Sequence, residues 1–246
     1  MKTQIGLKFY PKDITEKLLK SITGKVDFIE LMAMERTGRK TLEAVAASGI
    51  PANVHNMHLG QGVNLANTDR EKKNLRSLKL SVEMADYFSS KIIVVHPGER
   101  ENADCNVQNS AWLFRRMADK RILVENMPFI DGPDFFCRTP EEVAAFMKLA
   151  NCGFCLDIGH ATAAATGLGL NYIEHIKNFL ALRPSYFHLQ DTPTDLSHDQ
   201  HLHFGEGGMD LPRIFKMLPK DAMLCLETAN DIEGRLKDII FLKENI

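Results

Sequence analysis

Eight short apolar segments recur along this chain, and longer segments with helical spacing separate them. The eight strand candidates are residues 4–9, 26–32, 52–55, 91–95, 121–125, 153–157, 185–189 and 222–227. They lack the alternation of apolar and polar residues that marks a half-exposed sheet, which indicates parallel strands buried on both faces. This pattern predicts an α/β protein built from repeated strand–helix units.

The segments between the strands carry helix signals. Thr139, Pro140, Glu141 and Glu142 place a capping residue, a first-turn proline and two acids before an apolar run. The predicted helices are residues 13–22, 41–48, 69–88, 106–118, 143–149, 172–182, 213–218 and 231–243. Eight strands, each followed by a helix, predict a (β/α)₈ TIM barrel, a fold that usually needs about 250 residues. No linker interrupts the 246 residues, so we expect one domain over residues 1–246.

Charge and composition limit the classes of function. The formal net charge is −2, so no global positive field attracts nucleic acid, although a local basic patch is compatible with that total. No run of about 18 apolar residues is present, so we expect no membrane segment. The N-terminus becomes polar too early for a signal peptide. Five cysteines without the spacing of a disulfide framework indicate free thiols in a reducing cytoplasm.

Histidines and carboxylates follow the predicted strands at their C-terminal ends, where the chemistry of such barrels is located. The nine candidates are His55, His96, Glu125, Asp157, His160, His188, Asp199, His201 and Glu227. A single histidine at such a position is most often structural, but carboxylates that converge in a partly dry volume raise the pKa of one another. Divalent cations remove this cost, and imidazole with carboxylate is the ligand set of zinc, manganese and iron. The residues therefore predict a metal site.

The number of candidate ligands bears on the number of metals. One metal takes about three to five protein ligands, so nine are too many for one ion and suit three ions if a carboxylate bridges. A metal cluster suits phosphate esters, because the metals generate a nucleophile at neutral pH and stabilise a leaving alkoxide. A single metal suits a hydroxy-carbonyl sugar, in which the metal polarises two oxygens while flanking carboxylates move a proton.

Six fragments in this order resemble the superfamily of endonuclease IV and the xylose-isomerase-like sugar isomerases and epimerases. They are VVHPG, LVENMP, LDIGHA, FHLQDT, DQHLHFGEG and LETAN, and the likeness extends over nearly the whole chain from VDFIEL onward. In endonuclease IV-like enzymes three metal ions, usually zinc, share nine ligands. The resemblance assigns them as His55, His96 and the bridging Glu125, then Asp157, His188 and Glu227, and finally His160, Asp199 and His201.

The resemblance implies two activities. The leading hypothesis is a phosphoesterase with up to three zinc ions, or manganese, that acts on abasic-site DNA or a smaller phosphoester, with Glu227 bearing on the attacking water. The alternative is a one-metal sugar or sugar-phosphate isomerase or epimerase, in which Glu125 and Glu227 are the catalytic proton shuttles. Its pattern of Glu125, Asp157, His188 and Glu227 is also present, but no arginine follows His188. The residues that make sense as ligands mainly in the three-metal hypothesis are His55, His96, Asp199 and His201. A barrel that binds a ligand without catalysis is a third hypothesis.

Several residues depart from the endonuclease pattern or stay open. The loop at residues 33–40 is short for a DNA-binding loop, and its basic residues Arg36, Arg39 and Lys40 either touch phosphate or are simply solvated. His58 stands where a DNA-facing tyrosine is expected, and it either contacts substrate or packs. We further expect a surface position for His175 and core positions for Trp112 and Phe114. His198 and His203 are expected to be loop residues that do not bind metal.

Overall fold

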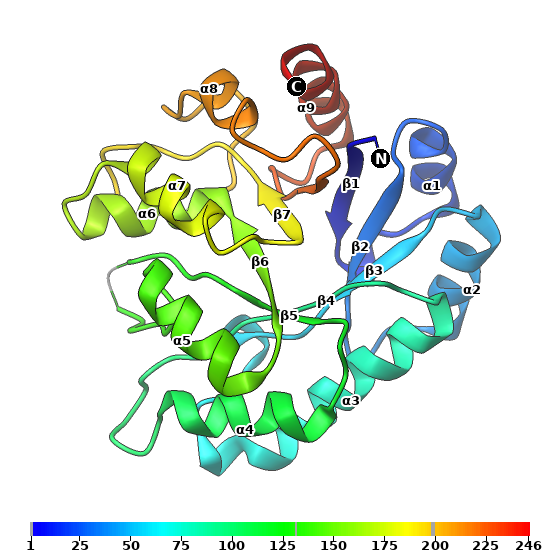
Figure 1. Cartoon of the computed structure of the whole chain (residues 1–246). Helices are drawn as coiled ribbons and strands as arrows, with labels where there is room; N and C mark the ends of the chain where they lie inside the picture. The colour runs from blue at the N-terminus through cyan, green and yellow to red at the C-terminus, as the bar shows by residue number, and fades with distance from the viewer. Residues whose placement is uncertain (1, 131, 198–199) are drawn as a thin grey trace.

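Eight parallel strands close a barrel in the computed structural model, which describes residues 2–130, 132–197 and 200–246 (Figure 1). The strands are β1 (Gln4–Phe9), β2 (Phe28–Met32), β3 (Ala52–His55), β4 (Ile93–Val95), β5 (Ile122–Glu125), β6 (Gly153–Asp157), β7 (Tyr186–Leu189) and β8 (Met223–Leu226). Each strand pairs with the next, and β1 pairs with β8. The predicted TIM barrel is confirmed, and each predicted strand differs from the observed one by at most two residues at either end.

Helices cover the outside of the barrel (Figure 1). They are α1 (Glu16–Ile22), α2 (Arg39–Ser48), α3 (Glu71–Phe88), α4 (Val107–Met117), α5 (Pro140–Ala150), α6 (Ile158–Gly167), α7 (Tyr172–Leu180), α8 (Leu211–Phe215) and α9 (Ile232–Asn245). Short 3₁₀ helices occupy Pro11–Asp13, Leu59–Gln61 and Thr68–Arg70. The Thr139 side chain caps α5 by accepting the amide N–H of Glu142, as the sequence predicts. Within the described residues, no helix combines the length and apolar character needed to cross a membrane.

Helix α6 corrects the prediction of a single helix after the sixth strand. It begins directly after β6, and α7 follows it. Its first eight residues are all buried, so the helix has no polar face that would mark it in the sequence. Asp157 caps it, because its Oδ1 accepts the amide N–H of His160 at 2.7 Å. The three-residue spacing of Asp157 and His160 is therefore that of a helix N-cap, and it brings both side chains to the same end of the barrel.

Two further expectations are wrong. Trp112 is 43% exposed, because it shares the outer face of α4 with Arg116, whose guanidinium lies 4.8 Å from its ring centroid. Phe114 is buried as expected. His175 is buried rather than on the surface, because it shares the inner face of α7 with Phe179, whose ring centroid is 4.9 Å away.

The interior of the barrel has an apolar part and a polar part. The apolar part comprises Phe28, Ile92, Val94, Leu123, Cys155, Tyr186 and Cys225. Side chains alternate between the two faces of a strand, so residues two positions apart point the same way. On six strands the residue two positions after one of these apolar side chains is a histidine or a carboxylate, namely Glu30, His96, Glu125, Asp157, His188 and Glu227. The strand period therefore directs a ring of polar side chains into the C-terminal end of the barrel.

The opposite end carries an ion-pair cluster that we expect to stabilise the fold. Arg121, just before β5, lies 2.6 Å from Asp119 and 2.7 Å from Asp86 on α3. Hydrogen bonds from Arg121 lower the pKa of Asp119 despite its burial. The guanidinium of Arg121 thus favours the ionised form of Asp119. The ion pairs of Arg121 connect the start of β5 with α3.

We predict that Asp119→Asn lowers the free energy of unfolding by about 1 kcal/mol at neutral pH. Because the pKa of Asp119 is lower in the folded than in the unfolded protein, its contribution is present above about pH 4 and is lost as pH falls through the folded value. Urea unfolding of wild type and variant between pH 3 and 7 measures this difference. A difference that grows as the pH falls would contradict the assignment.

Candidate metal centre

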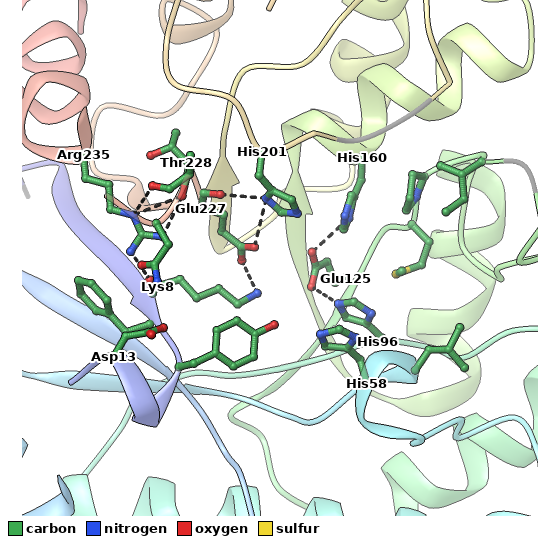
Figure 2. Close-up of a pocket in the computed structure, with 18 of the residues that line it drawn as sticks. Lys8, Asp13, His58, His96, Glu125, His160, His201, Glu227, Thr228 and Arg235 are labelled. Atoms are coloured by element: carbon green, nitrogen blue, oxygen red, sulfur yellow. Dashed lines mark hydrogen bonds and ion pairs between the residues drawn. The ribbon is translucent and has the colours of Figure 1, made fainter. Parts of the chain in front are cut away.

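Glu125, the last residue of β5, occupies the middle of the site. The Nε2 atoms of His55 and His96 lie 3.2 and 3.0 Å from its Oε2. The Nδ1 atoms of His160 and His188 both lie 3.2 Å from its Oε1. Figure 2 shows Glu125 between His96 and His160. A carboxylate between two pairs of imidazoles has the geometry of a ligand that bridges two cations.

Backbone carbonyls orient three of the histidines. A carbonyl only accepts hydrogen bonds, so an imidazole nitrogen beside one carries the proton, and the other nitrogen carries the lone pair that can bind a metal. In all three rings it is Nδ1 that donates. The pairs are His55 with Asn56 (2.7 Å), His160 with Asn126 (2.9 Å) and His201 with Glu227 (2.9 Å). Their Nε2 atoms are therefore the ligand atoms. The lone pair on Nε2 of His55 faces the carboxylate of Glu125, and a cation between the two would stabilise this contact.

His188 has the reverse orientation. Its Nε2 lies 3.0 Å from Oε2 of Glu30, a buried carboxylate on β2, and its Nδ1 faces Glu125 and Glu227 at 3.2 and 2.7 Å. A carboxylate on the far nitrogen of a metal-binding imidazole fixes the ring and raises its basicity. Glu30 is therefore placed to orient His188 toward the centre of the site.

We predict that Glu30→Gln weakens metal binding about tenfold to a hundredfold, the usual effect of losing an orienting carboxylate. The amide keeps the shape of the side chain but removes the charge that raises the basicity of His188. Calorimetric titration with Zn²⁺ measures the change, with Glu142→Gln on α5 as the matched control. Unchanged affinity in Glu30→Gln would show that His188 needs no orienting partner.

Asp157 links the helix cap to the site. Its carboxylate accepts hydrogen bonds from Gln190 Nε2 at 2.9 and 3.1 Å and from the His160 amide. The same carboxylate lies 3.8 Å from Nδ1 of His188, its register partner on β7. Gln190 and the helix thus hold Asp157 in place beside the imidazole.

Three groups of side chains bring ligand atoms within 4.8 Å of one another. They are Glu30, His55, His188 and Glu227; His55, His96 and Glu125; and Glu125, Asp157 and His188. All but His96 are buried. Imidazole nitrogens and carboxylate oxygens are the donors that zinc and manganese take, so the residues fit a centre for divalent metal ions.

The pKa shifts of His96 and Glu125 also suit metal ligands. Burial lowers the pKa of His96 to about 4, and the neighbouring rings of His55 and His160 act in the same direction. Burial opposes the charge of Glu125, but the electrostatic effects of His96 and His188 hold its pKa well below its ordinary value. A neutral imidazole beside an ionised carboxylate is the form in which both bind a metal.

The structure brings most of the predicted ligands together. His55, His96, Glu125, Asp157, His160, His188 and Glu227 converge as described above. His201 lies at the rim, with its side chain 42% exposed and its Nδ1 3.9 Å from Glu227 Oε2. Asp199, like His198, lies outside the described residues. His203 does not join the site, because it lies 2.6 Å from each of Asp231 and Asp238.

Lys8 and Glu30 are site residues that the pattern of strand ends does not predict. Lys8 Nζ lies 2.6 Å from Glu227 Oε1 and 3.8 Å from Glu30 Oε1. Burial alone would lower the pKa of Lys8, but the charges of Glu227, Glu30 and Glu125 raise it. A charged residue within an apolar strand was the signal, in QIGLKF and FIELM, because such a residue must point to a polar interior.

A cavity of about 530 Å³ opens over these residues, within the size range of small-molecule sites. Its apolar lining includes Leu59, Met127, Pro128, Ile130 and Phe135. Its polar lining includes Lys8, Tyr10, Lys12 and Asn230. His58 lines the cavity and also packs, because its ring stacks on that of His96 with centroids 4.8 Å apart. Arg36, Arg39 and Lys40 are exposed, and Arg39 pairs with Glu43 at 2.7 Å.

Comparison with known proteins places this geometry in a family. The model of the xylose isomerase-like TIM barrel family matches residues 21–245. The chain belongs to this family. A probable endonuclease 4 from Mycobacterium leprae is 26% identical over 220 residues, which span 85% of this chain and 84% of that relative.

Solved structures show the same fold. Endonuclease IV from Thermus thermophilus aligns with a TM-score of 0.71 and 23% identity, over 98% of each chain. A D-tagatose 3-epimerase-like protein aligns with a TM-score of 0.73 and 20% identity, over 99% of this chain and 97% of the other. Members of the superfamily include endonucleases and epimerases, so the family membership does not select one reaction.

Proposed function

We propose that this chain is a metal-dependent phosphoesterase of the endonuclease IV type with a centre of two or three divalent ions. The position of Glu125 between two pairs of imidazoles carries the proposal, because its Oε2 faces the Nε2 atoms of His55 and His96 at 3.2 and 3.0 Å and its Oε1 faces the Nδ1 of His188 at 3.2 Å. Centres with two metals are typical of enzymes that cleave phosphate esters. Zinc is the expected ion and manganese the second choice.

The residues of the chain have distinct roles in this proposal. When bound, the metals supply a nucleophile at neutral pH and neutralise the phosphoryl oxygens. His55, His96 and Glu125 would hold one ion, and Glu227, which lines the cavity, would orient the attacking water. The cavity volume and the net charge of −2 favour a smaller phosphoester over a long DNA duplex, with abasic-site DNA as the other substrate to test.

A sugar or sugar-phosphate isomerase or epimerase is the second candidate. Glu125, Asp157 and Glu227 all face Nδ1 of His188, at 3.2, 3.8 and 2.7 Å, which groups the four residues that a single-metal isomerase needs. In that reaction Glu125 and Glu227 would move the proton between the two carbons. The candidate gives no role as ligands to His55 and His96, although both rings face Glu125.

The deciding experiment offers three substrate classes to the metal-replete protein: an abasic-site duplex, small phosphoesters and a panel of ketoses. His96→Ala is the informative variant, because only the phosphoesterase uses His96 as a ligand. We expect phosphoester hydrolysis that falls at least about a hundredfold in this variant, or about 2.7 kcal/mol of transition-state stabilisation. His175→Gln is the matched control outside the site.

Interconversion of ketoses without hydrolysis of any phosphoester, and unaffected by His96→Ala, would replace the proposal with the isomerase. Turnover of none of the three classes would leave a ligand-binding barrel. Elemental analysis gives an independent measure, since two or more ions per chain support the phosphoesterase and one ion supports the isomerase.

A further inference from the structure

Lys8 places an ammonium group among the carboxylates of the centre (Figure 2). Its Nζ contacts Glu227 Oε1 at 2.6 Å and lies 3.8 Å from Glu30 Oε1, which accepts no hydrogen bond from the described residues. The backbone of Lys8 is fixed in two ways. The Lys8 carbonyl accepts a hydrogen bond from the buried Arg235 at 2.7 Å, and Lys8 pairs in register with Glu30 on β2. The ammonium is therefore a built part of the site.

The charge of this ammonium lies on one side of the centre. Within the described residues, Glu125 forms ion pairs with histidines and none with lysine or arginine. Glu227 and Glu30, by contrast, share the ammonium of Lys8. A metal ion that uses Glu227 as a ligand would bring two further positive charges next to Nζ, where like charges in a buried site repel strongly. The metal and the ammonium therefore compete for Glu227.

An ammonium that leaves Glu227 remains in the substrate cavity. Lys8 lines the same cavity as His96, His160 and His201, so its flexible side chain can meet a ligand bound there. Lysine on its four-carbon stem is a point charge suited to a phosphate oxygen. Lys12 lines the same cavity and adds a second positive charge to this side.

We propose that Lys8 is the counter-ion of Glu227 in the metal-free protein and binds the anionic phosphate of the substrate in the metal-loaded protein. The proposal rests on the metal centre proposed above. It couples the two binding events, because the lysine that opposes the metal at Glu227 is the lysine that then holds the phosphate. Lys8 thereby selects substrates that carry a negative charge.

Calorimetry of Lys8→Met tests this role with the full chain, titrated first with Mn²⁺ and then with inorganic phosphate. We expect the weakest Mn²⁺ ion to bind at least about tenfold more tightly than in wild type, because the competing charge is gone. We expect phosphate to bind the Mn²⁺-loaded variant at least about tenfold more weakly. The opposite signs are diagnostic, since a purely structural defect would weaken both.

Two controls separate charge and position. Lys8→Arg keeps the charge, and we expect its Mn²⁺ affinity to stay within about threefold of wild type. Lys12→Met removes a lysine from the same cavity. We expect its Mn²⁺ affinity also to stay within about threefold of wild type, because Lys12 forms no ion pair with a described carboxylate. Changes of the same sign in Lys8→Met, or changes below about threefold in both constants, would overturn the proposal.

Reductive methylation of the wild-type protein provides a test if Lys8→Met does not fold. Saturation with Mn²⁺ should increase the methylation of Lys8 several-fold, measured by peptide mass spectrometry, while that of exposed Lys17 stays constant. An unchanged rate at Lys8 would overturn the proposal. None of these measurements depends on turnover, so failure to find hydrolysis and failure of the role of Lys8 are distinguishable.

Discussion

Replacement of Glu125 by glutamine is expected to remove metal from both sides of the centre and to lower turnover at least about a thousandfold, or about 4 kcal/mol of transition-state stabilisation. Both oxygens of this buried carboxylate face imidazole nitrogens. Glutamine keeps one oxygen and replaces the other with an amide that only donates, so it cannot bridge two cations. The loss should therefore exceed that caused by removing a ligand of one ion alone.

Elemental analysis after dialysis measures the metal content, and hydrolysis of the preferred phosphoester measures turnover. Glu142→Gln is the matched control, because Glu142 lies on α5 and outside the three ligand groups. It should retain wild-type metal content. If Glu125→Gln retained two ions per chain and turnover within about tenfold of wild type, Glu125 would not be the bridging ligand.

The ligands could be predicted because the fold determines where functional residues lie. Once eight parallel strands are recognised, the residues at their C-terminal ends meet at one mouth, which is why Glu125, Asp157 and His188 could be proposed together. The bridging role of Glu125 came from the family resemblance and not from the strand pattern, because it depends on which oxygen faces which ring. That is a matter of side-chain distances of about 3 Å, and sequence spacing does not contain them.

Lys8 and Glu30 were missed for a different reason. The predicted ligands all come from strand ends and the loops after them, whereas both of these side chains lie within strands. Alternation along the strand explains them, because Glu30 lies two positions after Phe28 and Lys8 two positions after Gly6. A Cβ at Gly6 would lie 2.2 Å from the Phe28 ring, so the glycine makes room for that ring inside the barrel. Helix α6 was not predicted because its first eight residues are buried on every face, so its sequence lacks the apolar–polar period that marks a surface helix.

Asp238 on α9 holds the loop that carries His201 against the end of β8. Its buried carboxylate accepts the Nδ1–H of His203 at 2.6 Å, the hydroxyl of Thr228 at 2.7 Å and the amide N–H of Phe204 at 3.0 Å. Burial opposes the charge of His203, but its hydrogen bonds to the two aspartates raise its pKa. The loop at the metal centre thus depends on one buried carboxylate.

We expect Asp238→Asn to lower the free energy of unfolding by about 3 kcal/mol, as breaking a buried ion pair does, and Tm by about 9 °C. Asparagine keeps one accepting oxygen and replaces the other with an NH₂ group. That group would face the N–H of His203 and the hydroxyl of Thr228, which are donors and need an acceptor. Thermal unfolding of the chelator-treated protein measures the change without a contribution from bound metal. Asp231→Asn is the control, because Asp231 accepts the other N–H of His203 at 2.6 Å but is exposed, and solvent should compensate most of that loss. Equal losses in the two variants would contradict this expectation, because burial of Asp238 would then not strengthen its contact with His203.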